Sequence, residues 1–255
     1  MEVGRFSLID RVAIVTGGKR GLGRQIALAL ASAGAHVAVC TRVANDGALE
    51  KVVEEVRNLG RRSLGMRADA SQKADVDNAV DRVMSEFGRI DILVNNAAVL
   101  TTGAILEMSE EDWERHFSVN VRGYFLFSQA VGKRMVEQRK GSIVNIASDL
   151  AFKAVPGMGA YCVSKAGIVM LTRVFAQELG QHGIRVNAIA PGLFKTELSR
   201  PNWENPDFLK HMETITPLGR VGETDDMTGA VVFLASDASS YISGTTILVN
   251  GGGLA

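Results

Sequence analysis

Short apolar segments recur along the chain, and between them lie longer segments in which apolar residues recur every three or four positions. The first pattern is typical of buried strands, and the second is typical of helices that bury one face. We predict strands over residues 12–16, 37–41, 63–68, 90–95, 142–147, 186–189 and 246–249. Alternating strands and helices favour a parallel sheet with right-handed crossovers. The sequence therefore predicts an α/β fold in a single domain over residues 1–255, with a doubly wound, seven-stranded parallel sheet and helices on both faces.

Residues 194–221 interrupt this alternation. These 28 residues include Pro201, Trp203 and Pro206 among several charges, and they show no strand period. Connections of this length without regular structure are usually functional. We predict a substrate loop or lid with a short helix, and the alternative is a plain surface excursion.

Composition narrows the classes of protein. Lys and Arg number 28 and Asp and Glu also number 28, so no overall charge favours nucleic acid or an anionic membrane as a partner. The longest apolar stretches have only strand length, and the N-terminus carries no apolar signal segment. Cys40, Cys162 and the four histidines lack metal-ligand spacing, so we expect no metal site. We predict a cytoplasmic location, where both cysteines would stay reduced.

A glycine-rich turn follows the first predicted strand. Thr16, Gly17, Gly21 and Gly23 precede a helical pattern. Glycines allow the backbone to approach a pyrophosphate, and the free N–H groups at a helix start point toward its negative charge. The spacing departs from the common G-x-G-x-x-G, so an ordinary turn between strand and helix remains the alternative. Strand, turn and helix together predict a dinucleotide phosphate site.

Charge near this turn indicates which dinucleotide binds. In NAD-specific folds, a carboxylate about 20 residues after the glycines binds the ribose 2′-hydroxyl. Here neutral Thr41 ends the second strand and Arg42 follows it, while Lys19 and Arg20 lie within the glycine turn. Three basic groups without a carboxylate favour the 2′-phosphate of NADP(H), unless these are ordinary solvated surface residues.

Tyr161 and Lys165 are four residues apart in a predicted helix and therefore share one face. An ammonium about 4 Å from a phenol, at an effective dielectric near 20, is worth roughly 4 kcal/mol and would lower the phenol pKa by about three units. We therefore expect Tyr161 to act as an acid and base, although a ring covered by a lysine stem would give the same spacing. Ser148 lies upstream, but it lacks the G-x-S-x-G setting of a hydrolase nucleophile.

Six motifs resemble the short-chain dehydrogenase/reductase family in order and spacing, from about residue 8 to the C-terminus. They are Thr16-Gly17-x-x-x-Gly21-Leu22-Gly23, Asn95-Asn96-Ala97-Ala98, Asn120, Ser148, Tyr161-x-x-x-Lys165 and Pro191-Gly192. Two departures are small: Ala98 replaces a usual glycine beside the expected cofactor, and Asn250 stands where the family often has aspartate. The resemblance implies a Rossmann fold and hydride transfer between NADP(H) and a carbonyl or secondary alcohol.

The resemblance also implies roles for four catalytic residues. Tyr161 exchanges the proton, Ser148 polarises the substrate oxygen, and Lys165 lowers the tyrosine pKa and binds the nicotinamide ribose. Asn120 matches the position that holds a proton-relay water, and the alternative is a helix-interior asparagine that bonds the backbone.

Further cofactor contacts follow from the same resemblance, with Asp69 accepting from the adenine amino group. The complete predicted set is Gly17, Lys19, Arg20, Gly21, Leu22, Gly23, Thr41, Arg42, Asp69, Ala70, Asn95, Ala97, Tyr161, Lys165, Pro191, Gly192, Phe194 and Thr196.

The substrate stays open between two enzyme classes. A 3-oxoacyl reductase is slightly favoured, because Arg139 matches a residue that docks an acidic carrier protein, although His182 occupies the second such place. Asp149 and Lys153 suit a sugar, sugar-acid or polyol dehydrogenase such as a gluconate 5-dehydrogenase or glucose 1-dehydrogenase, unless both face solvent. A non-catalytic NADP-binding regulatory protein is the alternative outside the enzymes.

Residues 161–179 are apolar nearly all round, and one sheet cannot cover every side of such a helix. A second subunit is therefore expected. The resemblance implies a homotetramer, with helices over residues 113–138 and 161–179 at one dimer interface.

Overall fold

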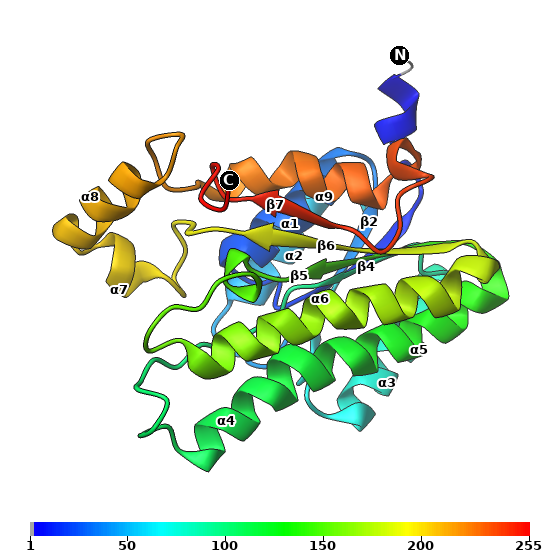
Figure 1. The fold of residues 1–255 in the computed structure, drawn as a ribbon. Helices are drawn as coiled ribbons and strands as arrows, with labels where there is room; N and C mark the ends of the chain where they lie inside the picture. The colour runs from blue at the N-terminus through cyan, green and yellow to red at the C-terminus, as the bar shows by residue number, and fades with distance from the viewer. Residues whose placement is uncertain (1–2) are drawn as a thin grey trace.

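Seven parallel strands form one sheet in the computed structural model, which describes residues 3–255 (Figure 1). The order across the sheet is β3-β2-β1-β4-β5-β6-β7, and each neighbouring pair is parallel. The strands are β1 Val12–Thr16, β2 His36–Thr41, β3 Ser63–Arg67, β4 Ile92–Asn95, β5 Gly141–Ile146, β6 Ile184–Pro191 and β7 Thr246–Val249. The predicted doubly wound, seven-stranded parallel sheet is confirmed.

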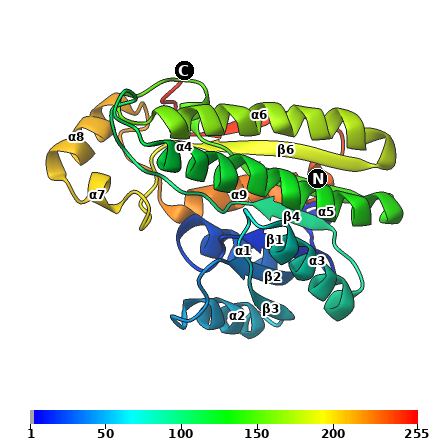
Figure 2. The same cartoon turned by 90° about the horizontal axis from the view of Figure 1, so that it is seen from below.

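Helices cover both faces of the sheet (Figure 2). One layer consists of α1 Gly21–Ser32, α2 Ala48–Asn58 and α9 Thr228–Ala235. The other consists of α3 Lys73–Phe87, α5 Gly123–Gln138 and α6 Gly159–Leu179. Short 3-10 turns span Val3–Phe6, Asp149–Ala151, Gly180–His182, Thr224–Met227 and Asp237–Ser239. No helix within residues 3–255 is both long and apolar enough to cross a membrane.

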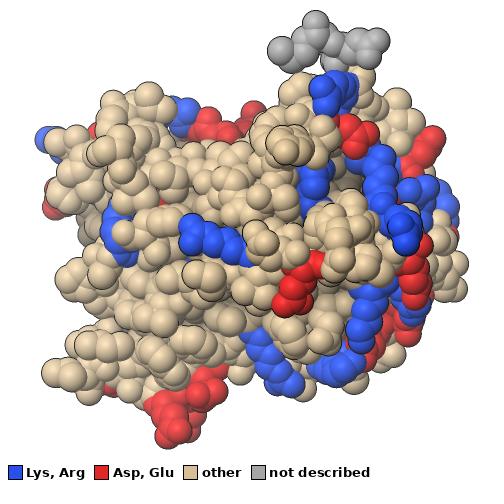
Figure 3. Space-filling view, turned by 45° about the vertical axis from the view of Figure 1, so that its right-hand side comes forward, with Lys and Arg blue, Asp and Glu red and all other residues tan. Residues whose placement is uncertain are grey.

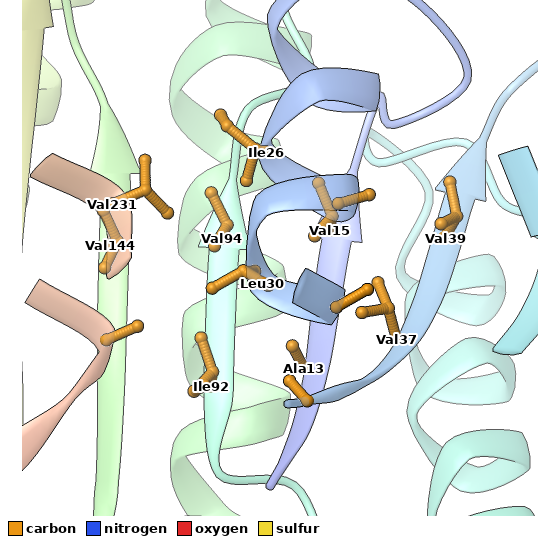
Figure 4. Close-up of a cluster of buried hydrophobic side chains, with 14 of the residues drawn as sticks. Ala13, Val15, Ile26, Leu30, Val37, Val39, Ile92, Val94, Val144 and Val231 are labelled. Carbon is orange, nitrogen blue, oxygen red and sulfur yellow. The ribbon is translucent and has the colours of Figure 1, made fainter. Parts of the chain in front are cut away.

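The core follows from the two-residue period of a strand. Every residue of β1 is buried, because its side chains point alternately to the two helical layers. Ala13 and Val15 face Ile26 and Leu30 of α1 (Figure 4). Val12 and Ile14 belong to the cluster on the other face. Each fully buried valine or leucine contributes about 1.5–3 kcal/mol, which fixes β1 at the centre of the sheet.

The helix that precedes β5 has an irregular middle. It begins as α4 Glu110–His116, where the Ser109 hydroxyl caps the first turn by accepting from the Asp112 amide. A π-helical turn over Phe117–Arg122 then leads into α5. Such turns occur frequently at functional sites, and this one carries the predicted residue Asn120.

Two short helices extend beyond the carboxyl end of β6. They are α7 Arg200–Trp203 and α8 Pro206–Ile215, and they project away from the sheet (Figure 1). The segment closes where Phe194 pairs with Gly222. The sequence predicted one short helix in residues 194–221, and the structure has two because Pro206 and the Asn205 cap start a second helix.

Candidate active site

A groove lies at the carboxyl edge of the sheet, where the strand order reverses between β1 and β4. Ligands of doubly wound sheets bind at such a switch point. The groove contains a cavity of about 610 Å³. It is lined by many of the predicted cofactor residues: Gly17, Lys19, Arg20, Gly21, Leu22, Gly23, Thr41, Arg42, Asp69, Ala70, Ala97 and Thr196.

The glycine turn can bind a phosphate for two reasons. Its backbone packs too closely for side chains at Gly17 and Gly23, and the amide groups at the start of α1 have no side-chain cap within residues 3–255. Gly17 has φ +64°, and an added Cβ would lie 2.8 Å from the Ala97 Cα. A Cβ at Gly23 would lie 2.3 Å from the Gly17 carbonyl oxygen. Among the described residues, no side chain caps the first turn of α1. Its amide groups therefore remain available to a pyrophosphate.

Asn96 holds this turn in place, a role that was not predicted from the sequence. Its side-chain amide donates to the carbonyl oxygens of Thr16 at 2.9 Å and Gly17 at 3.1 Å. The Thr16 hydroxyl accepts from the backbone amides of Asn96 and Ala97. The repeated Asn-Asn after β4 was the available signal, but only the fold shows which asparagine reaches β1.

Six predicted cofactor residues do not line this cavity: Asn95, Tyr161, Lys165, Pro191, Gly192 and Phe194. Asn95 is buried, and its amide donates to Ser128 of α5 and Asn145 of β5. Phe194 is also buried and packs against Gly222, beside a second cavity of about 450 Å³. Pro191 and Gly192 continue β6 along the same carboxyl edge.

The three basic residues near the expected 2′-phosphate differ in their surroundings. Arg20 and Arg42 are exposed at the groove. Lys19 instead donates to the Val43 carbonyl oxygen at 2.9 Å and pairs with Asp46 at 2.5 Å. Asp46 could not be predicted as a partner of Lys19, because a carboxylate on the following loop carries no local signal of its partner.

Asn120 is fully buried and ties two segments together. Its amide oxygen accepts from the Val99 amide at 2.8 Å, and its nitrogen donates to the Val99 carbonyl at 3.0 Å and the Ser164 hydroxyl at 3.1 Å. Of the two predicted readings, these bonds agree with an asparagine that bonds backbone. Asn120 thus fixes the chain after β4 against α6.

Lys165 is the buried cation of the site. Its ammonium donates to the Ile146 carbonyl oxygen at 2.8 Å and lies 3.4 Å from the Tyr124 hydroxyl. Tyr124 donates to the same carbonyl at 2.9 Å. Burial lowers the pKa of Lys165 to about 7, because a charged ammonium loses water there.

Tyr161 shares one face of α6 with Lys165, whose ammonium is 5.5 Å from the centre of the phenol ring. Burial raises the pKa of Tyr161 to about 12, and nearby Asp149 also raises it, whereas a hydrogen bond with Ser148 acts in the opposite direction. The predicted lowering of this pKa is therefore wrong for this structure. The reason is that Lys165 points to the Ile146 carbonyl, and desolvation of the phenol dominates.

A carboxylate, that of Asp149, lies beside Ser148. Asp149 is 8% exposed, and one of its oxygens lies 3.5 Å from the Ser148 hydroxyl. Its other oxygen pairs with Lys153 at 2.9 Å. The alternative in which both residues face solvent is wrong for Asp149, because the turn after β5 buries its side chain.

Arg139 and His182 lie far from Ser148 in the folded chain. They precede β5 and β6, so they are at the amino edge of the sheet. Ser148 follows the carboxyl end of β5, which is about 20 Å away along a six-residue strand. The two predicted carrier-docking residues therefore do not border Ser148 of the same chain.

Among residues 3–255, no three His, Cys, Asp or Glu side chains gather in a way that could hold a metal ion. The two cysteines are free thiols, and Cys40 is buried.

Comparison with known proteins identifies the family of the chain. A family model described as enoyl-(acyl carrier protein) reductase matches residues 17–253. The chain is 39% identical to 3-oxoacyl-[acyl-carrier-protein] reductase FabG of Staphylococcus epidermidis over 96% of this chain and 99% of that protein. It is 40% identical to 2-dehydro-3-deoxy-D-gluconate 5-dehydrogenase of Escherichia coli over the full length of both.

A solved structure agrees with these matches. Gluconate 5-dehydrogenase from Burkholderia cenocepacia, in complex with NADP and tartrate, superposes with a TM-score of 0.95 at 34% identity and covers 99% of this chain and 98% of that one. The family model and both relatives span nearly the whole chain. This chain belongs to the short-chain dehydrogenase/reductase family.

Proposed function

We propose that this oxidoreductase uses NADP(H) to transfer a hydride between the nicotinamide and a carbonyl or secondary alcohol. The observation that carries the proposal is that Ser148, Tyr161 and Lys165 gather at the carboxyl end of β5, on the same edge of the sheet as the glycine groove. When bound, NADP(H) supplies or accepts the hydride. The protein provides the binding site and the proton.

The side chains have complementary roles in this reaction. In reduction, the carbonyl carbon gains the hydride, and the carbonyl oxygen takes the proton of the Tyr161 hydroxyl. The Ser148 hydroxyl donates a hydrogen bond to the same oxygen and stabilises its developing negative charge. In oxidation, the Tyr161 phenolate accepts the alcohol proton. The Lys165 ammonium lies 5.5 Å from the ring centre, where its positive charge offsets only part of the cost that burial places on the phenolate.

Charge supports NADP(H) rather than NAD(H). β2 ends at Thr41, which is neutral. In NAD-specific folds this place holds a carboxylate that binds the 2′-hydroxyl and would repel a 2′-phosphate. Arg20 and Arg42 flank this point on the groove, where their guanidinium groups would hold the 2′-phosphate. The related Burkholderia cenocepacia enzyme was solved with NADP, which agrees with this assignment.

The similarity to FabG supports a 3-oxoacyl substrate. The position of Arg139 and His182 does not add to this support, since both lie at the other edge of the protomer.

A polyhydroxylated substrate is the second candidate, and the Asp149–Lys153 pair favours it. A carboxylate beside Ser148 accepts hydrogen bonds from hydroxyl groups next to the reacting carbon, and Lys153 offers an ammonium to a substrate carboxylate. The chain is also 42% identical to D-threitol dehydrogenase of Mycolicibacterium smegmatis over 97% of this chain and 94% of that protein.

The test is a substrate panel followed by absorbance at 340 nm with NADPH and NADH in reduction, and with NADP and NAD in oxidation. The panel contains acetoacetyl-CoA, 5-ketogluconate, threitol, gluconate and an aryl ketone. We expect turnover with NADPH or NADP that falls about 10²–10⁴-fold in Tyr161→Phe, because a positioned acid contributes about that factor. Tight NADPH binding without turnover of any carbonyl or alcohol would favour the regulatory alternative.

We also propose a homotetramer. Val163, Met170 and Val174 are 49%, 56% and 45% exposed along one face of α6, and Phe125 of α5 is 40% exposed beside it. Phe125 contacts Phe175, so the two helices present one apolar surface. In Figure 3, charged side chains gather toward one side, and a broad area of the molecule lacks them. A second copy of the chain suits such a surface.

A further inference from the structure

Lys19 links the glycine turn to the loop after β2. Its ammonium donates to the Val43 carbonyl oxygen at 2.9 Å and to an Asp46 carboxylate oxygen at 2.5 Å. The Lys19 side chain is only 10% exposed, whereas that of Asp46 is 47% exposed. Lys19 is therefore already partnered at the place where the sequence pattern assigned it to a phosphate.

Asp46 stays ionised in this arrangement. The hydrogen bond from Lys19 lowers the pKa of its carboxyl below the usual range, and the Ala48 amide acts in the same direction. This amide donates to the other carboxylate oxygen at 3.2 Å, so Asp46 also supports the start of α2. A negative charge is thus held beside Lys19 at neutral pH.

The Lys19–Asp46 pair lies where it can affect cofactor binding. Lys19, Arg42 and Val43 all line the groove at the carboxyl end of β2, where the adenosine ribose of a dinucleotide lies. A 2′-phosphate at this point is attracted by Arg20, Arg42 and Lys19 and repelled by Asp46. A 2′-hydroxyl is nearly indifferent to all four charges.

We propose that Asp46 is a specificity-determining residue that competes with the 2′-phosphate for Lys19, and so narrows the difference in affinity between NADP(H) and NAD(H). This inference rests on the dinucleotide site of the proposed function. Two features separate Asp46 from the acidic residue of NAD-specific folds. Asp46 lies five residues beyond Thr41, and its carboxylate bonds a lysine instead of a ribose hydroxyl.

The test compares two nucleotides that differ only in the 2′-phosphate. Calorimetry gives the Kd of adenosine 2′,5′-bisphosphate and of 5′-AMP for the wild type and for Asp46→Asn. Asparagine keeps an oxygen for the Ala48 amide and removes the charge, so the loop retains its cap. We expect the Kd for the bisphosphate to fall about five- to tenfold and the Kd for 5′-AMP to change less than twofold.

Two controls test the route of the effect. Glu50→Gln removes a charge from the exposed first turn of α2 and should leave both Kd values unchanged. In a chain that already carries Lys19→Met, the Asp46→Asn change should tighten bisphosphate binding by a smaller factor than in the wild type. The ammonium for which Asp46 and the 2′-phosphate compete is then gone.

The inference is overturned if Asp46→Asn leaves the ratio of the two Kd values unchanged, or tightens both nucleotides equally. If both nucleotides bind the wild type in that case, the dinucleotide site stands and only the role of Asp46 fails. If neither binds, the site and the inference fail together.

Discussion

Burial of Lys165, at the scale of one residue, lowers the stability of the fold. Burial lowers its pKa from 10.5 to about 7, so the folded chain holds this proton less strongly than the unfolded chain does. Between about pH 7 and 10.5, the unfolded state binds more protons, and the contribution of Lys165 makes stability rise with pH. Buried lysine therefore destabilises the fold at neutral pH while it serves the proposed chemistry.

We predict that Lys165→Met is inactive but more stable than the wild type, by roughly 2 kcal/mol at pH 8. The Ile146 carbonyl keeps the Tyr124 hydroxyl as its donor, so the substitution leaves no buried acceptor unpaired. Urea unfolding at pH 7, 8.5 and 10 measures the difference, which should shrink as the pH rises toward 10.5. A variant that is less stable at every pH would contradict this account.

The charge of Asp149 affects Tyr161, also at the scale of one residue. Its negative charge raises the pKa of Tyr161, so Asp149→Asn should lower that pKa and move the alkaline rise of alcohol oxidation to lower pH. The same change should raise KM for polyols or sugar acids severalfold, with little effect on a simple secondary alcohol. pH profiles of kcat/KM for both substrate types provide the measurement. Equal effects on both types would remove Asp149 from substrate recognition.

At the scale of elements, a strand could be predicted where its residues are buried on both faces and its sequence is therefore an apolar run. The run from Val12 is apolar without interruption because both faces of β1 are covered. β6 was predicted too short, as residues 186–189 of Ile184–Pro191, since Arg185 breaks the apolar pattern near its start; Asn187 lies within the predicted part. The structure pairs Arg185 with carbonyls near the end of α9, and Asn187 with the Ile242 carbonyl. Those partners are distant in sequence, so no local pattern contains them.

In the site, too, features set by local sequence were predictable and those set by distant contacts were not. The four-residue spacing of Tyr161 and Lys165 and the glycine turn are local features of α6 and the β1–α1 connection, and both were predictable. The partners of Lys19 and of Ser148 were not, because Asp46 and Asp149 gain their roles through the folding of loops. The direction of the Tyr161 pKa was wrong for a related reason. Desolvation depends on three-dimensional burial, which spacing does not encode.

The glycine turn gives a prediction with a matched control. Gly17 and Gly60 both have positive φ, at +64° and +76°, but an added methyl group clashes only at Gly17. Each alanine variant should lose about 1–2 kcal/mol through backbone strain. Gly17→Ala should lose more and should also bind adenosine 2′,5′-bisphosphate at least tenfold more weakly. Denaturation and calorimetry on both variants measure this, and unchanged nucleotide binding in Gly17→Ala would refute the phosphate-cradle assignment.

At the scale of the whole molecule, one side of α6 packs on the sheet and the other is uncovered. Ile168 and Thr172 are buried on the inner side, whereas Val163, Met170 and Val174 repeat at helical spacing on the outer side. Leaving these side chains in water forfeits the free energy of burying them. A partner helix from a second copy would recover it, and α5 would extend the contact through Phe125.

We therefore predict that Met170→Glu together with Val174→Glu reduces the molecular mass in solution, measured by light scattering, from a tetramer to a dimer or monomer. Two buried, unpaired carboxylates cost several kcal/mol per interface, which is enough to dissociate a micromolar assembly. Ile9→Glu is the control, because Ile9 is 63% exposed and lies beside Gly34, between α1 and β2. A tetramer that survives the double substitution would show that subunits meet elsewhere, and a wild-type monomer would rule out assembly through this face.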